Sequence, residues 1–213
     1  MAIIVPAILE KTKQDFDLRA RSFERLPDAL RIQVDFADGK FVPNTTIAIS
    51  ELEALSPVFT WEAHLMVEEP VDFFDYQMVG FSVLIVHYEA FGSVEQLESS
   101  LRKIRALGMK TGLAFNPETS VDLVVPYAEL VDQFTVLSIH PGMQGQEFLS
   151  ESYERIGALR RALPEAIIEV DGGINQETAR QAMQSGANLL AVGSALWEDP
   201  ARSFEDLESS LQP

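Results

Sequence analysis

Short apolar runs of strand length recur along the chain, and segments with a helical pattern lie between them. The runs cover residues 3–9, 29–36, 58–66, 82–86, 110–115, 134–139, 167–170 and 189–192. Strands that alternate with helices form parallel sheets, because each helix carries the chain back to the start of the next strand. The pattern therefore predicts an α/β fold built from eight parallel strands.

Several predicted helices carry capping residues at their ends. Ser93 and Gln96 have the spacing of a capping box ahead of one helix. Asn175 can cap a later helix, which would end before Gly186, and Asp199 precedes a proline that opens the last helix. These signals support helices between the later strands.

Eight strand–helix units in 213 residues favour a (β/α)₈ TIM barrel at the short end of the usual size range. The competing fold is a doubly wound open sheet. Such a sheet usually carries the glycine pattern GxGxxG after its first strand, and this chain lacks it there. We therefore expect residues 1–213 to form a single barrel domain.

Charge and cysteine content restrict the function. The net charge of −17 argues against nucleic acid and anionic membranes as partners, and a phosphorylated ligand would need a dedicated anion site. The chain has no cysteine, which excludes disulfides and thiolate metal sites and fits a reducing compartment. Neither a signal peptide nor a membrane span is expected from the apolar runs. These features predict a cytoplasmic protein.

Polar residues near the ends of the predicted strands are the candidates for chemistry, because a barrel of this kind places its site at the C-terminal ends of the strands. The second strand carries two of them, Gln33 and Asp35, on one face. The others are Asp38, Glu62, His64, His87, Glu89, Asn116, Ser138, His140, Glu169 and Asp171.

Glycines gather after the last three strands. They are Gly142 and Gly145, the pair Gly172 and Gly173, and Gly193, which Ser194 follows. Backbone N–H groups can close on an anion where no side chain intervenes. This asymmetry predicts a phosphate site at the end of the barrel.

Seven segments resemble, in order and spacing, the signature segments of ribulose-phosphate 3-epimerases. They read VDFADGKFVPN, AHLMVEEP, VHYEA, LAFNPETS, HPGMQGQEF, IEVDGGIN and AVGSALW, and the match to the family runs from about Val5 to Trp197. Relatives that epimerise allulose 6-phosphate share the same pattern. The resemblance implies a barrel that inverts C3 of a phosphorylated ketose with one divalent metal ion and two aspartates.

The resemblance also implies roles for individual residues. Asp35 and Asp171 match the acid–base pair, each of them also a metal ligand, and His64 matches a histidine ligand. Met66 matches a methionine that lines the site. The phosphate-binding loops of the family are matched by Gly145, Gly172, Gly173, Gly193 and Ser194. Gly142 is a further candidate for binding substrate.

The chain departs from the family pattern at five places. Gln33 stands where the family has a metal-binding histidine, and Ala7 stands where it has a serine that contacts substrate. The other departures are Ala37 and Leu137 in place of methionines and Gln144 in place of a glycine.

Gln33 leaves two readings open for the metal. Its amide oxygen could bind a cation with the two aspartates and His64, in an oxygen-rich site better suited to magnesium or manganese than to zinc. Iron is a further possible ion. Alternatively, Gln33 only hydrogen-bonds Asp35 or a water. His64 shares a strand face with Glu62, as metal-oriented histidines often do. His87 fits either a supporting position beside the site or the core, and His140 is expected to play no part.

Inversion beside a carbonyl needs a base on one face and an acid on the other, and two aspartates across a barrel mouth suit it. The leading hypothesis is therefore a ketose-phosphate 3-epimerase that interconverts ribulose 5-phosphate and xylulose 5-phosphate. The alternatives are a sugar-phosphate-binding barrel without activity and an enzyme that acts on another phosphorylated sugar. The sequence leaves open the substrate, the metal and whether the chain forms a homo-oligomer.

Overall fold

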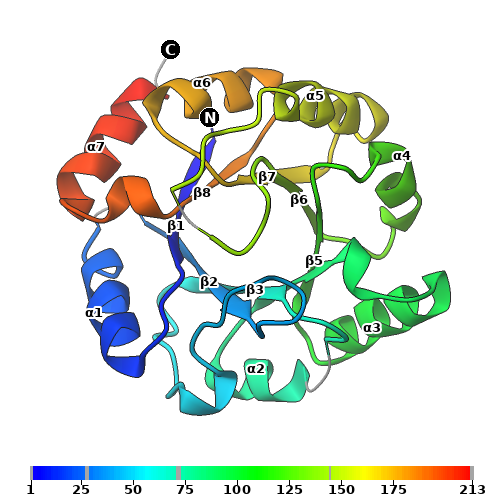
Figure 1. Ribbon diagram of the computed structural model, residues 1–213, viewed down its shortest axis with the longest axis horizontal. Coiled ribbons are helices and arrows are strands. Elements are labelled where there is room, and N and C mark those ends of the chain that lie inside the picture. Colours follow the sequence, from blue (N-terminus) through cyan, green and yellow to red (C-terminus); the bar gives the residue numbers. More distant parts are fainter. Residues whose placement is uncertain (1, 27–28, 71–72, 144, 212–213) are drawn as a thin grey trace.

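The computed structural model describes residues 2–26, 29–70, 73–143 and 145–211. Eight parallel strands close into a barrel in which each strand pairs with its neighbours in chain order and β8 pairs with β1 (Figure 1). The strands are β1 (Ile3–Ile8), β2 (Arg31–Ala37), β3 (Thr60–Met66), β4 (Val83–His87), β5 (Lys110–Phe115), β6 (Gln133–Leu137), β7 (Ile167–Asp171) and β8 (Leu189–Val192). The predicted (β/α)₈ barrel is confirmed, and strand bounds differ from the predicted ones by two residues or fewer at each end.

Helices surround the barrel and cover its outer face (Figure 1). The described residues form α1 (Lys13–Phe23), α2 (Phe73–Val79), α3 (Val94–Ala106), α4 (Val121–Val124), α5 (Ser152–Ala162), α6 (Gln176–Ser185) and α7 (Pro200–Ser210). Short 3₁₀ helices add η1 (Ile49–Glu51), η2 (Tyr88–Ala90), η3 (Val125–Tyr127) and η4 (Ser194–Leu196).

The connection from β2 to β3 differs from the predicted alternation, because it contains no α-helix. Residues 38–59 form a loop around η1, and all of them are described. The segment carries prolines at both ends and has no helical stripe of apolar residues. It anchors itself instead through the buried side chains of Ile47 and Leu52, so one crossover is made by a loop.

The predicted caps are confirmed with one correction. Asn175 accepts hydrogen bonds from the first turn of α6, and Asp199 caps α7. Ser93 accepts from the backbone N–H of Gln96, but the Gln96 side chain accepts from the N–H of Gly92. The capping box therefore closes one residue earlier in the chain than expected.

Successive side chains along each strand point alternately outward to the helices and inward to the barrel. One set of side chains packs between barrel and helices in a large apolar core that includes Trp61, Phe115 and Phe134. The other set points into the barrel and is unusually polar, with Gln33 and Glu169 fully buried there among others. Because buried polar groups need partners, this inner set is where the chemistry of the chain lies.

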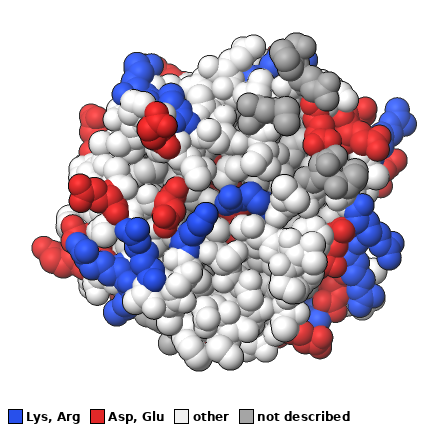
Figure 2. Space-filling view, turned by 180° about the vertical axis from the view of Figure 1, so that it is seen from behind, with Lys and Arg blue, Asp and Glu red and all other residues white. Residues whose placement is uncertain are grey.

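The outer surface carries charge of both signs. Figure 2 shows Lys and Arg in small groups among Asp and Glu on the face opposite that of Figure 1. Among the described residues, no helix has the length and apolar character needed to cross a membrane.

Candidate active site

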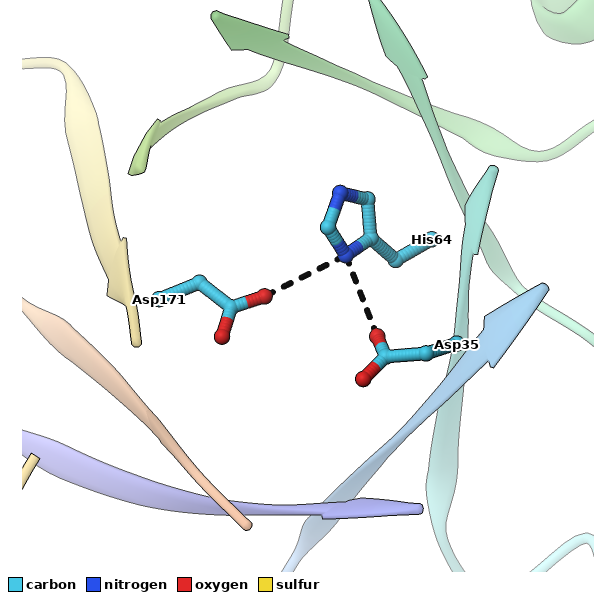
Figure 3. Close-up of side chains that lie close together, drawn as sticks. All are labelled: Asp35, His64 and Asp171. Carbon is cyan, nitrogen blue, oxygen red and sulfur yellow. Dashed lines mark hydrogen bonds and ion pairs between the residues drawn. The ribbon is translucent and has the colours of Figure 1, made fainter. Parts of the chain in front are cut away.

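Three titratable side chains from different strands meet inside the mouth of the barrel (Figure 3). Asp35 lies on β2, His64 lies beside it on β3, and Asp171 ends β7. In the strand register Asp35 is the direct partner of His64. The closed barrel brings β7 to the same place from the other side of β1 and β8. Residues far apart in the sequence therefore form one cluster.

One nitrogen of His64 faces both carboxylates. His64 Nδ1 lies 3.1 Å from Asp35 Oδ1 and 3.2 Å from Asp171 Oδ2. Asp35 and His64 are buried, while Asp171 keeps some exposure. The two acids thus reach the same nitrogen from different strands, as Figure 3 shows.

The amide nitrogen of Gln33 also contacts the cluster. Its Nε2 donates to Asp35 Oδ1 at 2.8 Å and to Asp171 Oδ2 at 2.9 Å. The amide oxygen Oε1 is buried and finds no hydrogen-bond partner among the described residues. Gln33 therefore bridges the two acids as a donor, in the arrangement that the second reading of this residue anticipates.

Burial and the neighbouring charges set the protonation of the cluster. Burial alone lowers the pKa of His64, but hydrogen bonds to Asp171 and Asp35, together with their charges, raise it to about 10. Burial raises the pKa of Asp35, and the charge of Asp171 adds to this effect, which hydrogen bonds from His64 and Gln33 only partly offset. Both groups tend to hold protons, which reduces the repulsion between the two carboxylates.

The cluster fits a divalent cation through three residues. Asp35, His64 and Asp171 each offer one ligand atom, and these atoms all lie within 4.8 Å of one another. Two carboxylates and an imidazole are donors that zinc, iron and manganese accept. Gln33 could join them only by turning its amide, so that the unpartnered Oε1 replaces Nε2. The donor set thus fits a metal site with three ligands in place.

His87 and Glu89 continue the cluster away from the mouth. His87 Nε2 lies 2.8 Å from His64 Nε2, and the buried His87 Nδ1 lies 3.5 Å from Glu89 Oε2. Burial lowers the pKa of His87 to about 4, despite its contact with Glu89, so this ring is neutral. Of the two readings of His87, the structure supports the one that places it beside the site.

A pocket opens above the three titratable residues, and every predicted substrate-binding residue lines it. These residues are Met66, Gly142, Gly145, Gly172, Gly173, Gly193 and Ser194. Asp35, His64 and Asp171 line the same pocket, whereas Gln33 is fully buried and does not reach it. Apart from Gln33, the structure therefore brings the expected site residues together around one cavity.

The loop glycines differ in why they must be glycine. A Cβ on Gly172 would lie 2.3 Å from Ile139 Cγ1, and one on Gly173 would lie 2.6 Å from the backbone nitrogen of Phe148. Packing alone therefore requires glycine at these two positions. At Gly145 a Cβ would meet nothing within 4 Å, although its φ of +78° favours glycine. Gly145 thus faces open space.

The departures from the family pattern lie close to this pocket. Ala7 and Leu137 line it, and Ala37 is buried against Met66 and Val42. Gln144 lies outside the described residues. The altered positions thus change the wall that a substrate would touch.

Glu62 does not orient His64, contrary to the prediction. It pairs with Arg31 and accepts from Gln133 Nε2 at 2.8 Å, deeper in the barrel. His64 takes His87 as the partner of its second nitrogen instead. Glu169 also lies deep, where it accepts from Thr135. Sequence spacing gave the face of each residue correctly but not its partner.

Some residues of the pocket were not predicted from the sequence. They are Leu9, Ile139, Pro141, Met143, Ile174 and Ala191. All six are apolar, so no chemical signal marks them in the sequence. Their positions one or two places from predicted site residues were the only available indication. His140, which was expected to play no part, is exposed and pairs with Glu118 at the surface.

Comparison with known proteins identifies the family. The model of the ribulose-phosphate 3 epimerase family matches residues 3–197. The chain belongs to this family. The resemblance inferred from the seven motifs is thereby confirmed.

Curated relatives agree along nearly the whole chain. The ribulose-phosphate 3-epimerase of Chlamydia trachomatis is 32% identical, with 99% of this chain and 92% of the relative covered. That of Bacillus subtilis is 34% identical, with 84% and 86% covered. Among solved structures, a 3-hexulose-6-phosphate synthase superposes with a TM-score of 0.73 at 14% identity and covers all of both chains. At that identity the solved structure supports the barrel fold alone.

Proposed function

We propose that this protein is a ketose-phosphate 3-epimerase that interconverts ribulose 5-phosphate and xylulose 5-phosphate. One observation carries the proposal: Asp35 on β2 and Asp171 on β7 meet at the same His64 nitrogen, at 3.1 and 3.2 Å, in a chain of this family. A substrate carbon above that point would have one acid on each of its faces. This is the arrangement that inversion requires.

The two aspartates divide the proton transfers between them. One carboxylate removes the proton from C3, and the electron pair of the C–H bond moves toward C2 as the C2 carbonyl becomes an enediolate. The other aspartic acid then gives its proton to the opposite face of C3, and the carbonyl re-forms. After one turnover the two aspartates have exchanged protonation states, so the same pair can catalyse the reverse reaction.

A divalent cation held by Asp35, His64 and Asp171 belongs to this proposal. When bound, it supplies positive charge that favours the enediolate. Zinc, iron, manganese and magnesium are all compatible with the donor set, and an oxygen from Gln33 would favour the last two. Gln33 otherwise keeps the acids apart and oriented by donating to both of them.

The phosphate end of the substrate belongs in the glycine-lined part of the pocket. We place it among Gly145, Gly172, Gly173, Gly193 and Ser194, which share the pocket wall with Asp171. Backbone N–H groups would supply the attraction, because the chain is strongly acidic and these loops contain no Lys or Arg. With this small ligand as its partner, the protein is proposed to act in the cytoplasm without nucleic acid or membrane.

The test is proton exchange at C3. Purified protein in deuterated buffer should exchange the C3 proton of ribulose 5-phosphate and form xylulose 5-phosphate, as followed by proton NMR. Metal content is measured on the same sample, and a chelator-treated sample shows how far exchange depends on it. The absence of both C3 exchange and product at high protein concentration would rule out the epimerase.

A second candidate is a sugar-phosphate-binding barrel without epimerase activity. The amide nitrogen of Gln33 between the two acids favours it, because that nitrogen stands where the carboxylates would share a cation. Ala7 favours a third candidate, an enzyme for another phosphorylated sugar, because it offers no hydroxyl to the pocket. Thermal stabilisation by ribulose 5-phosphate without C3 exchange would support the second. Exchange with a different ketose phosphate would support the third.

A further inference from the structure

We infer that His87 and Glu89 are positioning residues that fix the proton on the ring of His64. In this chain of contacts Glu89 holds the His87 proton on Nδ1, and the bare His87 Nε2 accepts from His64 Nε2–H. If a cation displaced the proton on His64 Nδ1, the lone pair of that nitrogen would be aimed at the point between Asp35 and Asp171. The inference rests on the proposed function, since it concerns how His64 is presented to a cation.

The contact between the two histidines is a hydrogen bond along a line. Their Nε2 atoms are 2.8 Å apart, the ring planes differ by 14°, and the ring centres are 5.0 Å apart. The distance between centres is about that of the hydrogen bond plus the two ring radii, so the rings meet edge to edge. Such a bond holds one proton, and only one of the two nitrogens can donate it.

Glu89 determines which histidine donates. Its Oε1 accepts from the backbone N–H of Asn116 at 2.8 Å and from the hydroxyl of Thr119. Its Oε2 is buried without a regular hydrogen bond and faces His87 Nδ1 at 3.5 Å. Because an ionised carboxylate can only accept, His87 Nδ1 must carry the proton that lies between them.

The opposite arrangement would disable His64 as a ligand. If His87 carried its proton on Nε2, it would donate to His64 Nε2, and a neutral His64 would then keep its proton on Nδ1. That proton would point at Asp35 and Asp171 and leave no lone pair for a cation. The direction of the hydrogen bond between His64 and His87 thus decides whether His64 can bind a metal.

Neither positioning residue lines the pocket. His87 is fully buried, and the ring of Phe41 covers it with centroids 4.8 Å apart. Glu89 lies beyond it in the middle of η2, held by the loop after β5. Both residues therefore act through His64 and without touching substrate.

The decisive variant is Glu89→Gln. A glutamine oxygen can still accept from Asn116 and Thr119, but its amide group would donate to His87 Nδ1 and move the His87 proton to Nε2. The chain has three histidines, so long-range nitrogen–proton NMR of the labelled protein resolves each ring. We expect His87 to be a neutral Nδ1–H tautomer in the parent and an Nε2–H tautomer in the variant. Zn²⁺ affinity, measured by calorimetry, should fall about 10- to 100-fold.

Glu118→Gln is the matched control. It removes a carboxylate that lies 3.2 Å from His140 Nδ1, but both groups of that pair are exposed. The control should leave the His87 tautomer and Zn²⁺ affinity unchanged. Glu89→Asp, which keeps a carboxylate, should retain the parental tautomer and lose less affinity than Glu89→Gln.

Two results would overturn the inference. One is an Nε2–H tautomer of His87 in the parent protein, a measurement that does not depend on whether a variant folds. The other is a folded Glu89→Gln protein with parental Zn²⁺ affinity. Failure of the proposed function is separate, because C3 exchange in the parent tests it directly. If the parent protein has the expected His87 tautomer but does not exchange the C3 proton, the positioning role of His87 and Glu89 stands and the epimerase proposal fails.

Discussion

Two buried polar clusters lie inside the same barrel, and only the deeper one contains a permanent cation. The mouth cluster consists of Gln33, Asp35, His64 and Asp171. The base cluster, deeper in the barrel, consists of Arg31, Glu62, Gln133 and Glu169. Both draw on β2, β3 and β7, and both place carboxylates where water is largely excluded.

The base cluster satisfies its charge internally. Arg31 pairs with Glu62 and donates to Gln133 Oε1 at 2.7 Å, while Gln133 Nε2 donates to Glu62 Oε2. Burial alone lowers the pKa of Arg31, but the hydrogen bond and charge of Glu62 raise it above its ordinary value, so Arg31 stays charged. Burial, with the charge of Glu62, raises the pKa of Glu169 well above the usual range. Arg31, Glu62 and Gln133 thus hold one another at this end of the barrel, while Glu169 keeps one oxygen without a hydrogen-bond partner among the described residues.

The mouth cluster has no fixed cation of that kind. Its two aspartates face a neutral amide and an imidazole, each of which can be rearranged or change its proton. Positive charge there must come from a proton or from a bound ion. The comparison shows how one scaffold makes buried acids inert at one end and available for chemistry at the other.

The largest effect is expected from removing either acid at the mouth. Asp35→Asn and Asp171→Asn should each lower the rate of epimerisation about 10²- to 10⁴-fold, because one face of C3 loses its proton-transfer group. Slow exchange on the remaining face can persist. The measurement is product formation and C3 deuterium uptake by NMR.

The control for this experiment is Asp75→Asn on the exposed face of α2, which should leave the rate unchanged. Thermal stabilisation by inorganic phosphate should survive in both mouth variants, since the glycine loops are intact. Full activity in Asp35→Asn and Asp171→Asn would show that the two-base assignment is wrong.

At the base, the same kind of change should alter stability. Arg31→Met leaves Glu62 buried without its cation and should lower the free energy of unfolding by about 3–5 kcal/mol. Arg102→Met, in an exposed ion pair with Glu98, should change it by about 0–1 kcal/mol. Urea denaturation of both variants measures the difference. Equal losses would mean that the base cluster contributes no more than a surface pair.

A smaller and more informative change is Gln33→His, which restores the family residue at the mouth. It should raise Zn²⁺ affinity about 10- to 100-fold, which is the usual effect on metal affinity of changing a residue around the metal. The epimerisation rate should rise with it. Calorimetry and the C3 assay follow the two quantities. Higher activity would indicate an epimerase weakened by Gln33, and loss of an existing activity would indicate a site retuned around the amide. Absence of both metal binding and exchange in parent and variant would leave a binding barrel.

The chain by itself determined the architecture and the membership of the site. Strand and helix periods, caps and glycine positions act over a few residues, so the sequence expresses them directly. The same alternation put Gln33, Asp35, Glu62 and His64 on the inner face, and the family motifs identified Asp171 and the loop glycines. The loop that replaces a helix after β2 was missed, because a barrel closes with any connection long enough to reach the next strand.

Only the tertiary structure decided the partners of those residues. Strands in a closed barrel are tilted and staggered, so the side chains that share a level come from different positions along each strand. In the register Asp35 pairs with His64 and His64 pairs with Ile85, yet His87, two residues further on, reaches the ring of His64. Because of the same stagger, Glu62 forms an ion pair with Arg31, and the amide nitrogen of Gln33 contacts both aspartates. The sequence determines which face a side chain takes, whereas its neighbours across the barrel depend on closure.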